Sequence, residues 1–204
     1  MADERIPEVL ASLVNQLAQL PGFGPKSAMR AAMKLLEWPR EKTEQLGKSI
    51  VELRERLTLC SRCFGLSEQD PCRICADPAR GRESLCVVPE WDSMLTLDRG
   101  AFYHGQYFVL GGLLGPLEKN DTARIRTERL LARLGEGEVT ELILALGATT
   151  DAETTGAWLV QSVKQHYPNV RITRLAQGIP LGAEVKYMDQ ETLRQSLRYR
   201  QELS

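Results

Sequence analysis

The chain has 204 residues, of which 43 % are apolar and 26 % are charged, so it is long enough to bury a sizeable core. The 26 basic and 27 acidic side chains give a net charge of −1, which excludes a general electrostatic attraction to nucleic acid. No apolar run approaches the roughly 18 residues of a membrane-spanning helix. The N-terminus is acidic and lacks the basic and then apolar order of a signal peptide, so we expect a cytoplasmic protein with no membrane partner.

The first 57 residues are predicted to be helical. Apolar residues recur at helical spacing over residues 6–20, and further helices are expected over residues 25–37 and 40–57. Between the first two helices, Pro21 and Gly22 interrupt the pattern, and Gly24 and Pro25 reopen it, with proline where a first helical turn tolerates it. This order predicts two helices joined by a tight hairpin.

The hairpin has the composition of a phosphate-binding turn. Backbone N–H groups remain unpaired at the start of its second helix, where the helix dipole favours an anion, and Gly22 and Gly24 permit a phosphate to come close. Lys26 and Arg30 stand four residues apart and therefore share one helix face. The pattern predicts a helix-hairpin-helix that binds DNA phosphates without reading the sequence. The alternative is a plain pair of helices with a glycine turn and solvated basic residues.

Four of the five cysteines form two Cys-x-x-Cys pairs that are eight residues apart. Each two-residue spacer allows a pair to hold one ion from a tight turn, and four thiolates in a tetrahedral set leave no position for water. In a reducing compartment this spacing predicts one structural zinc ion per chain rather than two disulfides or four unrelated core cysteines. The fifth cysteine, Cys86, falls in an apolar stretch and is interpreted as a buried side chain. The predicted ligands are Cys60, Cys63, Cys72 and Cys75.

After the cysteines, short apolar stretches alternate with helical ones, which predicts an α/β fold with a mainly parallel sheet covered on both faces. Another helix is expected at the C-terminus, over residues 189–203. The expected strands are residues 85–88, 107–110, 142–146 and 170–175, and the expected helices between them are residues 91–99, 122–134 and 153–166.

Three acidic residues, Glu90, Asp151 and Glu153, follow two of these strands. Ligands of open α/β sheets bind at the carboxyl ends of the strands, so in one interpretation the three carboxylates converge on Mg²⁺. In the other interpretation, which we favour, the residues support helix starts, with Asp151 just before a helix and Glu153 in its first turn.

The order of these motifs resembles the bacterial RecR family over essentially the whole chain. The resemblance rests on Leu-Pro-Gly-Phe-Gly-Pro-Lys-Ser-Ala at residues 20–28, the four cysteines, Val-Leu-Gly-Gly at residues 109–112, and Thr-Arg-Leu-Ala-Gln-Gly-Ile-Pro-Leu-Gly at residues 173–182. It implies four parts: a helix-hairpin-helix domain at residues 1–57, a four-cysteine zinc knuckle at 58–79, a Toprim domain at 80–176 and a C-terminal assembly segment at 177–204.

The resemblance also implies function. Proteins of this family form ring-shaped oligomers, often tetramers, that clamp single- or double-stranded DNA, and they act with RecO and RecF to help RecA displace single-strand-binding protein at gaps. By position, Lys26 and Arg30 match the DNA-contacting basic residues of the family, and the four cysteines match its zinc ligands. The chain is therefore expected in the bacterial cytoplasm, at the nucleoid when it acts on DNA.

The Toprim stretch departs from the general pattern of that domain. Pro89 stands where a glutamate directly follows the first strand, and Glu90 comes one position later, which should turn its side chain to the opposite face. Asp151 keeps an acidic position, but the Asn-Pro and the glycine of the usual stretch are missing. We therefore expect no Mg²⁺ chemistry, no catalytic residue and no enzyme. The alternatives are a Mg²⁺-dependent nuclease or primase-like enzyme that uses the three acids, and a zinc protein that binds only other proteins.

Overall fold

The chain divides into two compact units, Met1–Arg56 and Leu57–Ser204. The computed structural model describes residues 6–115 and 125–202. Within these residues, no helix combines the length and the apolar character needed to cross a membrane.

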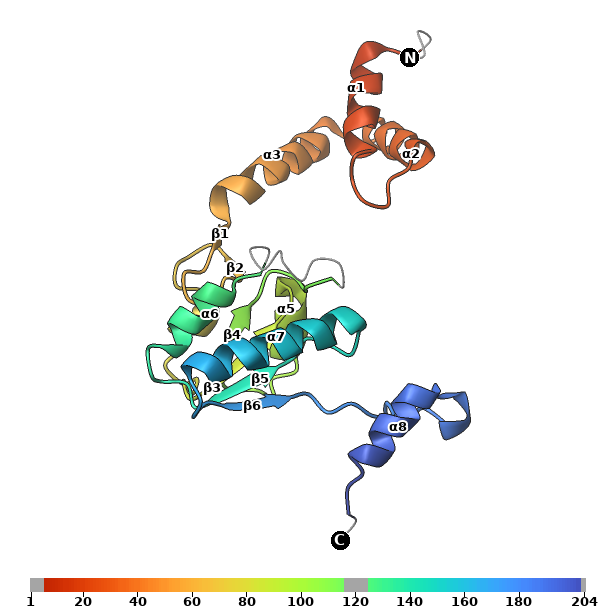
Figure 1. Cartoon of the computed structure of the whole chain (residues 1–204). Helices are drawn as coiled ribbons and strands as arrows, with labels where there is room; N and C mark the ends of the chain where they lie inside the picture. The colour runs from red at the N-terminus through yellow and green to blue at the C-terminus, as the bar shows by residue number, and fades with distance from the viewer. Residues whose placement is uncertain (1–5, 116–124, 203–204) are drawn as a thin grey trace. The chain divides into compact units, whose positions relative to one another are not determined.

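The N-terminal unit contains the three helices expected from the periodicity, α1 (Glu8–Leu17), α2 (Pro25–Leu36) and α3 (Arg40–Arg56) (Figure 1). Helix α1 is shorter than the predicted residues 6–20, because Pro7 occupies its N-cap and the turn before the hairpin begins after Leu17. Its buried Val14 packs against two fully buried alanines of α2. Helix α3 contributes no buried residue.

A four-stranded sheet forms the centre of the second unit, in the order β4-β3-β5-β6, and all of its strand pairs are parallel. This confirms the predicted α/β class and the parallel sheet. The chain passes from β3 to β4 on one side and then crosses back to β5 on the other side of β3. The strands are β3 (Ser84–Val88), β4 (Gln106–Val109), β5 (Glu141–Leu144) and β6 (Arg171–Arg174).

Both faces of the sheet are covered, so the sequences of its central strands are nearly continuous runs of apolar residues. Along β3, Leu85 and Val87 face a core completed by α6 and α7, whereas Cys86 and Val88 face a second core that includes Met94 of α5. The connecting helices are α5 (Trp91–Arg99), α6 (Thr127–Leu134) and α7 (Thr150–His166) (Figure 1).

Two of these helices begin at other residues than the periodicity predicted. Helix α6 begins at Thr127 instead of residue 122, and residues 122–124 lie outside the described part of the chain. Helix α7 begins at Thr150 instead of residue 153, because the Thr149 side chain accepts a hydrogen bond of 3.2 Å from the Ala152 N–H and caps the helix there.

The four cysteines lie in a small subdomain, which we call the cysteine knuckle (residues 58–76). It consists of an antiparallel pair, β1 (Thr58–Leu59) and β2 (Leu66–Ser67), followed by the short helix α4 (Arg73–Ala76), none of which the periodicity predicted. The knuckle packs on the edge of the sheet. The Val109 N–H donates to the Cys63 carbonyl at 2.7 Å, and the rings of Phe64 and Phe108 meet edge to face with centroids 5.4 Å apart.

The C-terminal segment follows β6 and contains a 3-10 helix, η2 (Val185–Tyr187), and helix α8 (Gln190–Arg198). Asp189 caps α8 by accepting from the Thr192 N–H at 2.9 Å. The helix is shorter than the predicted residues 189–203, of which residue 203 lies outside the described chain. Neither η2 nor α8 contains a buried residue.

Candidate metal centre and nucleic-acid interface

The cysteine knuckle brings all four predicted ligands together. The sulfur atoms of Cys60, Cys63, Cys72 and Cys75 lie within 4.8 Å of one another, and all four residues are buried. Two turns present them. The Cys60 N–H bonds the Gly65 carbonyl at 2.9 Å around the first turn, and the Ala76 N–H bonds the Cys72 carbonyl at 2.9 Å around the second. Cys86 lies outside this group, buried in β3, as predicted.

The electrostatics of the four sulfurs fit a divalent cation. Hydrogen bonding between the sulfurs of Cys63 and Cys72, 3.6 Å apart, raises the pKa of Cys63, and contact with Cys63 raises the pKa of Cys75. The same thiols donate to Cys72 and lower its pKa. Without a cation, therefore, one thiolate is stabilised by its protonated neighbours, and four thiolates together require a compensating positive charge. A closed tetrahedral set of four thiolates is a donor set that zinc prefers.

Zinc binding is therefore expected to release protons. Because the pKa values of Cys63 and Cys75 are raised, both thiols are protonated at pH 7 and must lose their protons when zinc binds. The apparent zinc affinity should thus rise with pH and fall as the solution is acidified. Calorimetric titration in buffers of different ionisation enthalpy measures this release. An observed binding enthalpy that is the same in every buffer would contradict the expectation.

The hairpin between α1 and α2 leaves the start of α2 open. Gly22 has a φ of +80°, a conformation that favours glycine, and the Phe23 N–H closes the turn on the Leu20 carbonyl at 3.0 Å. Gly24 precedes α2 in an extended conformation, and no side chain caps this helix. The first amide groups of α2 are therefore available to an external acceptor.

Lys26 and Arg30 are both exposed and lie on the same side of α2, as the spacing predicted. Among the described residues Lys26 has no ion-pair partner, and Arg30 makes only a 3.4 Å hydrogen bond to Ser27. Lys34, one turn further on, is instead paired with Glu37 at 2.6 Å. Of the two uncompensated charges, Lys26 thus lies in the first turn of α2 and Arg30 lies one turn further along the helix. They border a shallow groove of about 610 Å³ that is lined by Pro25, Lys26, Met29 and Arg30.

Two of the three acidic candidates meet at the carboxyl edge of the sheet. Glu90 follows β3 and Asp151 lies in the first turn of α7, and both line a cavity of about 540 Å³. The chain leaves β3 and β5 toward opposite faces here, which is where open α/β sheets bind ligands. Glu90 thus lines the cavity although it stands one position later than in the general Toprim pattern, and Pro89 lines it too. Asp151 is not before the helix, since Thr149 holds the cap.

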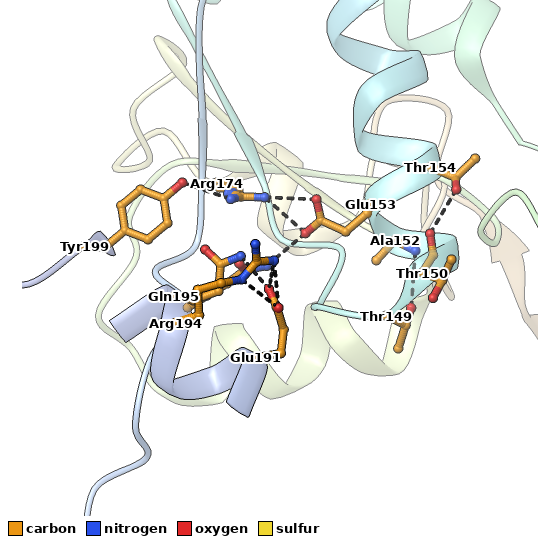
Figure 2. A network of polar contacts seen from close by, with 11 residues as sticks. Thr149, Thr150, Ala152, Glu153, Thr154, Arg174, Glu191, Arg194, Gln195 and Tyr199 are labelled. Carbon is orange, nitrogen blue, oxygen red and sulfur yellow. Dashed lines mark hydrogen bonds and ion pairs between the residues drawn. The ribbon is translucent and has the colours of Figure 1, made fainter. Parts of the chain in front are cut away.

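Glu153 does not join this cavity. Figure 2 shows its carboxylate directed at Arg174 of β6, whose Nη1 lies 3.0 and 3.1 Å from the two carboxylate oxygens. The Gln177 amide donates to the same carboxylate at 2.9 Å, and Arg174 also donates to the Tyr199 hydroxyl at 3.1 Å. Glu153 therefore connects α7 to the C-terminal segment. In the described residues, the four cysteines are the cluster close enough to share an ion, and the three acids form none.

Family models match the chain in four consecutive stretches. They are described as RecR, helix-hairpin-helix, over residues 10–54; RecR, four-cysteine zinc finger domain, over residues 57–77; Toprim domain, over residues 83–176; and RecR, C-terminal, over residues 178–201. The recombination protein RecR of Nitratidesulfovibrio vulgaris is 55 % identical over 200 residues, which cover 98 % of this chain and 100 % of that protein. The chain belongs to the RecR family.

Other RecR proteins are similar over nearly the same length. That of Maridesulfovibrio salexigens is 50 % identical over 98 % of this chain and 100 % of its own, and that of Gloeobacter violaceus is 42 % identical over 95 % and 98 %. The resemblance inferred from the motifs is thus confirmed, as is the four-cysteine metal-binding site. The motifs did not identify Arg174 and Gln177 as partners of Glu153. Arg174 is the last residue of β6 and Gln177 follows three residues later. This place at the end of a strand was the available signal, because polar residues there face the loops around them.

Proposed function

We propose that this chain is a DNA-binding, non-catalytic mediator of recombinational DNA repair. In this proposal it acts in the bacterial cytoplasm, on the nucleoid, as a tetrameric ring that clamps DNA and works with RecO and RecF to help load RecA onto gapped single strands. Its parts are a DNA-binding domain at residues 1–57, a zinc knuckle at 58–79, a Toprim domain at 80–176 and an assembly segment at 177–204. The open start of α2 carries the proposal.

The hairpin supports binding to phosphates rather than to bases. Lys26 and Arg30 present uncompensated positive charges near an uncapped helix start. Neither the two charges nor the free amide groups of the helix distinguish one base from another. Gly24 adds an independent observation. Its φ is ordinary and a Cβ there would meet nothing within 4 Å, so the fold itself does not require glycine at this position. A ligand backbone that approaches closely would require it, and Gly22 and Gly24 would both border that ligand.

The metal proposed for Cys60, Cys63, Cys72 and Cys75 is one structural zinc ion per chain. The closed donor set supports stability rather than catalysis, because no coordination position remains for a substrate.

Assembly is supported by apolar surface that the described chain does not bury. On α3, Leu46, Ile50 and Leu53 recur at helical spacing with exposed fractions of 38, 64 and 61 %. By contrast, Leu10 and Leu13 of α1 pack against the small core of their own unit. We therefore place the proposed contact with a second copy on α3 rather than on α1. The C-terminal segment also exposes apolar side chains, among them Leu181, Val185 and Leu197.

Ile50→Asp is expected to leave the chain folded, to shift it to a smaller species and to weaken its DNA binding. The side chain is 64 % exposed within the chain, so a charge there costs little unless a second copy covers it. Sedimentation velocity and circular dichroism, with and without gapped DNA, measure assembly and folding together. Several hairpins held in one ring bind DNA at a high effective concentration, so binding should fall with assembly.

Phe102→Asp is the matched control, because Phe102 is 70 % exposed and lies outside α3. This variant should assemble and bind DNA as the unsubstituted chain does. Two results would contradict the proposed clamp: an unsubstituted chain that stays monomeric at high concentration with and without DNA, or an Ile50→Asp variant of unchanged size.

One observation favours a second function. Glu90 and Asp151 line the same cavity at the edge of the sheet, as two ligands of a Mg²⁺-dependent nuclease or primase-like enzyme would. Incubation of gapped DNA and nucleotides with Mg²⁺ separates the functions. Strand cleavage or primer synthesis that Asp151→Asn abolishes would replace the non-catalytic proposal.

A further inference from the structure

Three arginines and two glutamates join the cysteine knuckle to the loop before β5. We call Arg62, Arg82, Arg133, Glu136 and Glu138 the arginine cluster. The Nη2 atom of Arg62, which lies between two of the cysteines, is 3.1 Å from Glu136 and 3.6 Å from Glu138. Arg82 reaches the other oxygen of Glu138 at 3.0 Å. The cluster therefore connects residues 74 positions apart in the chain.

Arg133 makes this cluster more than a set of surface ion pairs. Its side chain is only 6 % exposed and contacts the carboxylates of both Glu136 and Glu138. A buried guanidinium without carboxylates is strongly destabilising, so Arg133 holds both glutamates in place whether or not Arg62 is there. Arg62 thus pairs with carboxylates that are already held in position. An ordinary exposed ion pair contributes little to stability, because both of its side chains must be ordered when it forms.

The two cysteine turns differ in this respect. Arg62 lies in the first turn, between Cys60 and Cys63, and its side chain is held by the glutamates of the loop before β5. Arg73 lies in the second turn, between Cys72 and Cys75, but it is exposed and has no ion-pair or hydrogen-bond partner among the described residues. The net charges of the metal centre and of the arginine cluster are also opposite in sign. Four thiolates and one Zn²⁺ carry a net charge of −2, and the cluster has one more positive than negative group.

We propose that Arg62 is a positioning residue for the metal centre. By holding the first cysteine turn against Glu136 and Glu138, it slows the loss of the metal ion. Substitutions in the loop before β5, outside the knuckle, therefore change how long the ion is retained. The inference rests on the proposed zinc site but not on the proposed DNA binding.

Zinc release into a chromogenic chelator tests this. Release from Arg62→Gln should be roughly 10-fold faster than from the unsubstituted chain. A factor of about 10 is the lower end of the loss in metal affinity that follows when a residue supporting the metal ligands is substituted. Arg73→Gln, which removes the same charge from the other turn, should release zinc at the unsubstituted rate. Glu136→Gln should accelerate release by a smaller factor, because Glu138 still receives Arg62. The double variant Arg62→Gln with Glu136→Gln should release zinc no faster than Arg62→Gln alone. Both changes remove the same contact, that between Arg62 and Glu136, so their effects should not add.

Cobalt substitution separates positioning from general damage. The cobalt spectrum of Arg62→Gln should still report four thiolate ligands, because no ligand has changed. Equal release from Arg62→Gln and Arg73→Gln would overturn the inference while leaving the zinc proposal intact. An unsubstituted chain that holds no metal would instead overturn the zinc site itself. Should Arg62→Gln fail to fold, Glu136→Gln decides, since it leaves both cysteine turns unchanged; release at the unsubstituted rate would then overturn the inference.

Discussion

Replacing Lys26 and Arg30 together by alanine is expected to weaken DNA binding by about 100-fold at low salt. Each charge-assisted phosphate contact is worth roughly 1.4 kcal/mol or more, which is a tenfold change in Kd. Loss of two contacts should also lower the slope of log K against log salt by about 1.4 to 1.8. Because the contacts go to phosphates, unrelated DNA sequences should lose affinity equally. Fluorescence anisotropy at several salt concentrations measures all three effects.

The paired control is Lys34→Ala with Arg40→Ala. It removes the same charge from the same unit, but Lys34 and Arg40 are already paired with Glu37 and Glu44 at 2.6 and 2.7 Å. If both double variants weaken binding equally, general electrostatics and not the hairpin would explain the affinity. Gly24→Ala adds a test without a change of charge. It should fold normally and bind DNA more weakly, because its Cβ meets nothing in the chain but obstructs a close phosphate.

Removal of zinc is expected to melt the cysteine knuckle and to lower the unfolding midpoint by roughly 10 to 20 °C. A loss of about 5 kcal/mol, less than the apparent binding energy of zinc-finger peptides, produces such a shift at 2–4 °C per kcal/mol. The effect should spread, because the knuckle shares a hydrophobic core with Met94 of α5 and Tyr107 of β4. Hydrogen exchange should therefore increase at residues 58–80 and also in α5.

Two cysteine substitutions provide the comparison. Cys72→Ser should lose the metal and reproduce the chelated state, whereas Cys86→Ala should retain one zinc ion per chain, because Cys86 is not part of the four-sulfur group. Unchanged protection of residues 58–80 after complete chelation would show that the knuckle does not depend on its metal. Purified protein without metal and with all four thiols paired as disulfides would rule out the zinc site itself.

Most of the fold could be predicted because its signals are local. Apolar periodicity located α1, α2, α3 and α5 nearly to their ends, and four short apolar runs located the sheet strands. The errors have local causes of another kind. Helix α7 begins three residues early because Thr149 caps it, and β1, β2 and α4 are too short for any periodicity to be visible.

The contacts of the three acidic candidates could be predicted only in part from their positions in the sequence. Their positions after strands predicted a shared edge of the sheet, and Glu90 and Asp151 do share it. Glu153, only two residues beyond Asp151, is turned to Arg174 and Gln177 instead. Neighbours on a helix point in different directions, and which direction meets a partner depends on the strand that packs beside it.

Short stretches of sequence suffice to predict the four-cysteine set, the glycine hairpin with its two basic residues, and the alternation of strands and helices, because each is encoded in residues close together in the chain. Which side chains meet across elements is settled only in the folded chain. Glu153 and Arg174 are 21 positions apart, and Arg62 and Glu136 are 74 positions apart. Their contacts follow from the strand order and from the seating of the knuckle on β4. No local pattern carries that information, because it is the burial of the two cores that selects the arrangement.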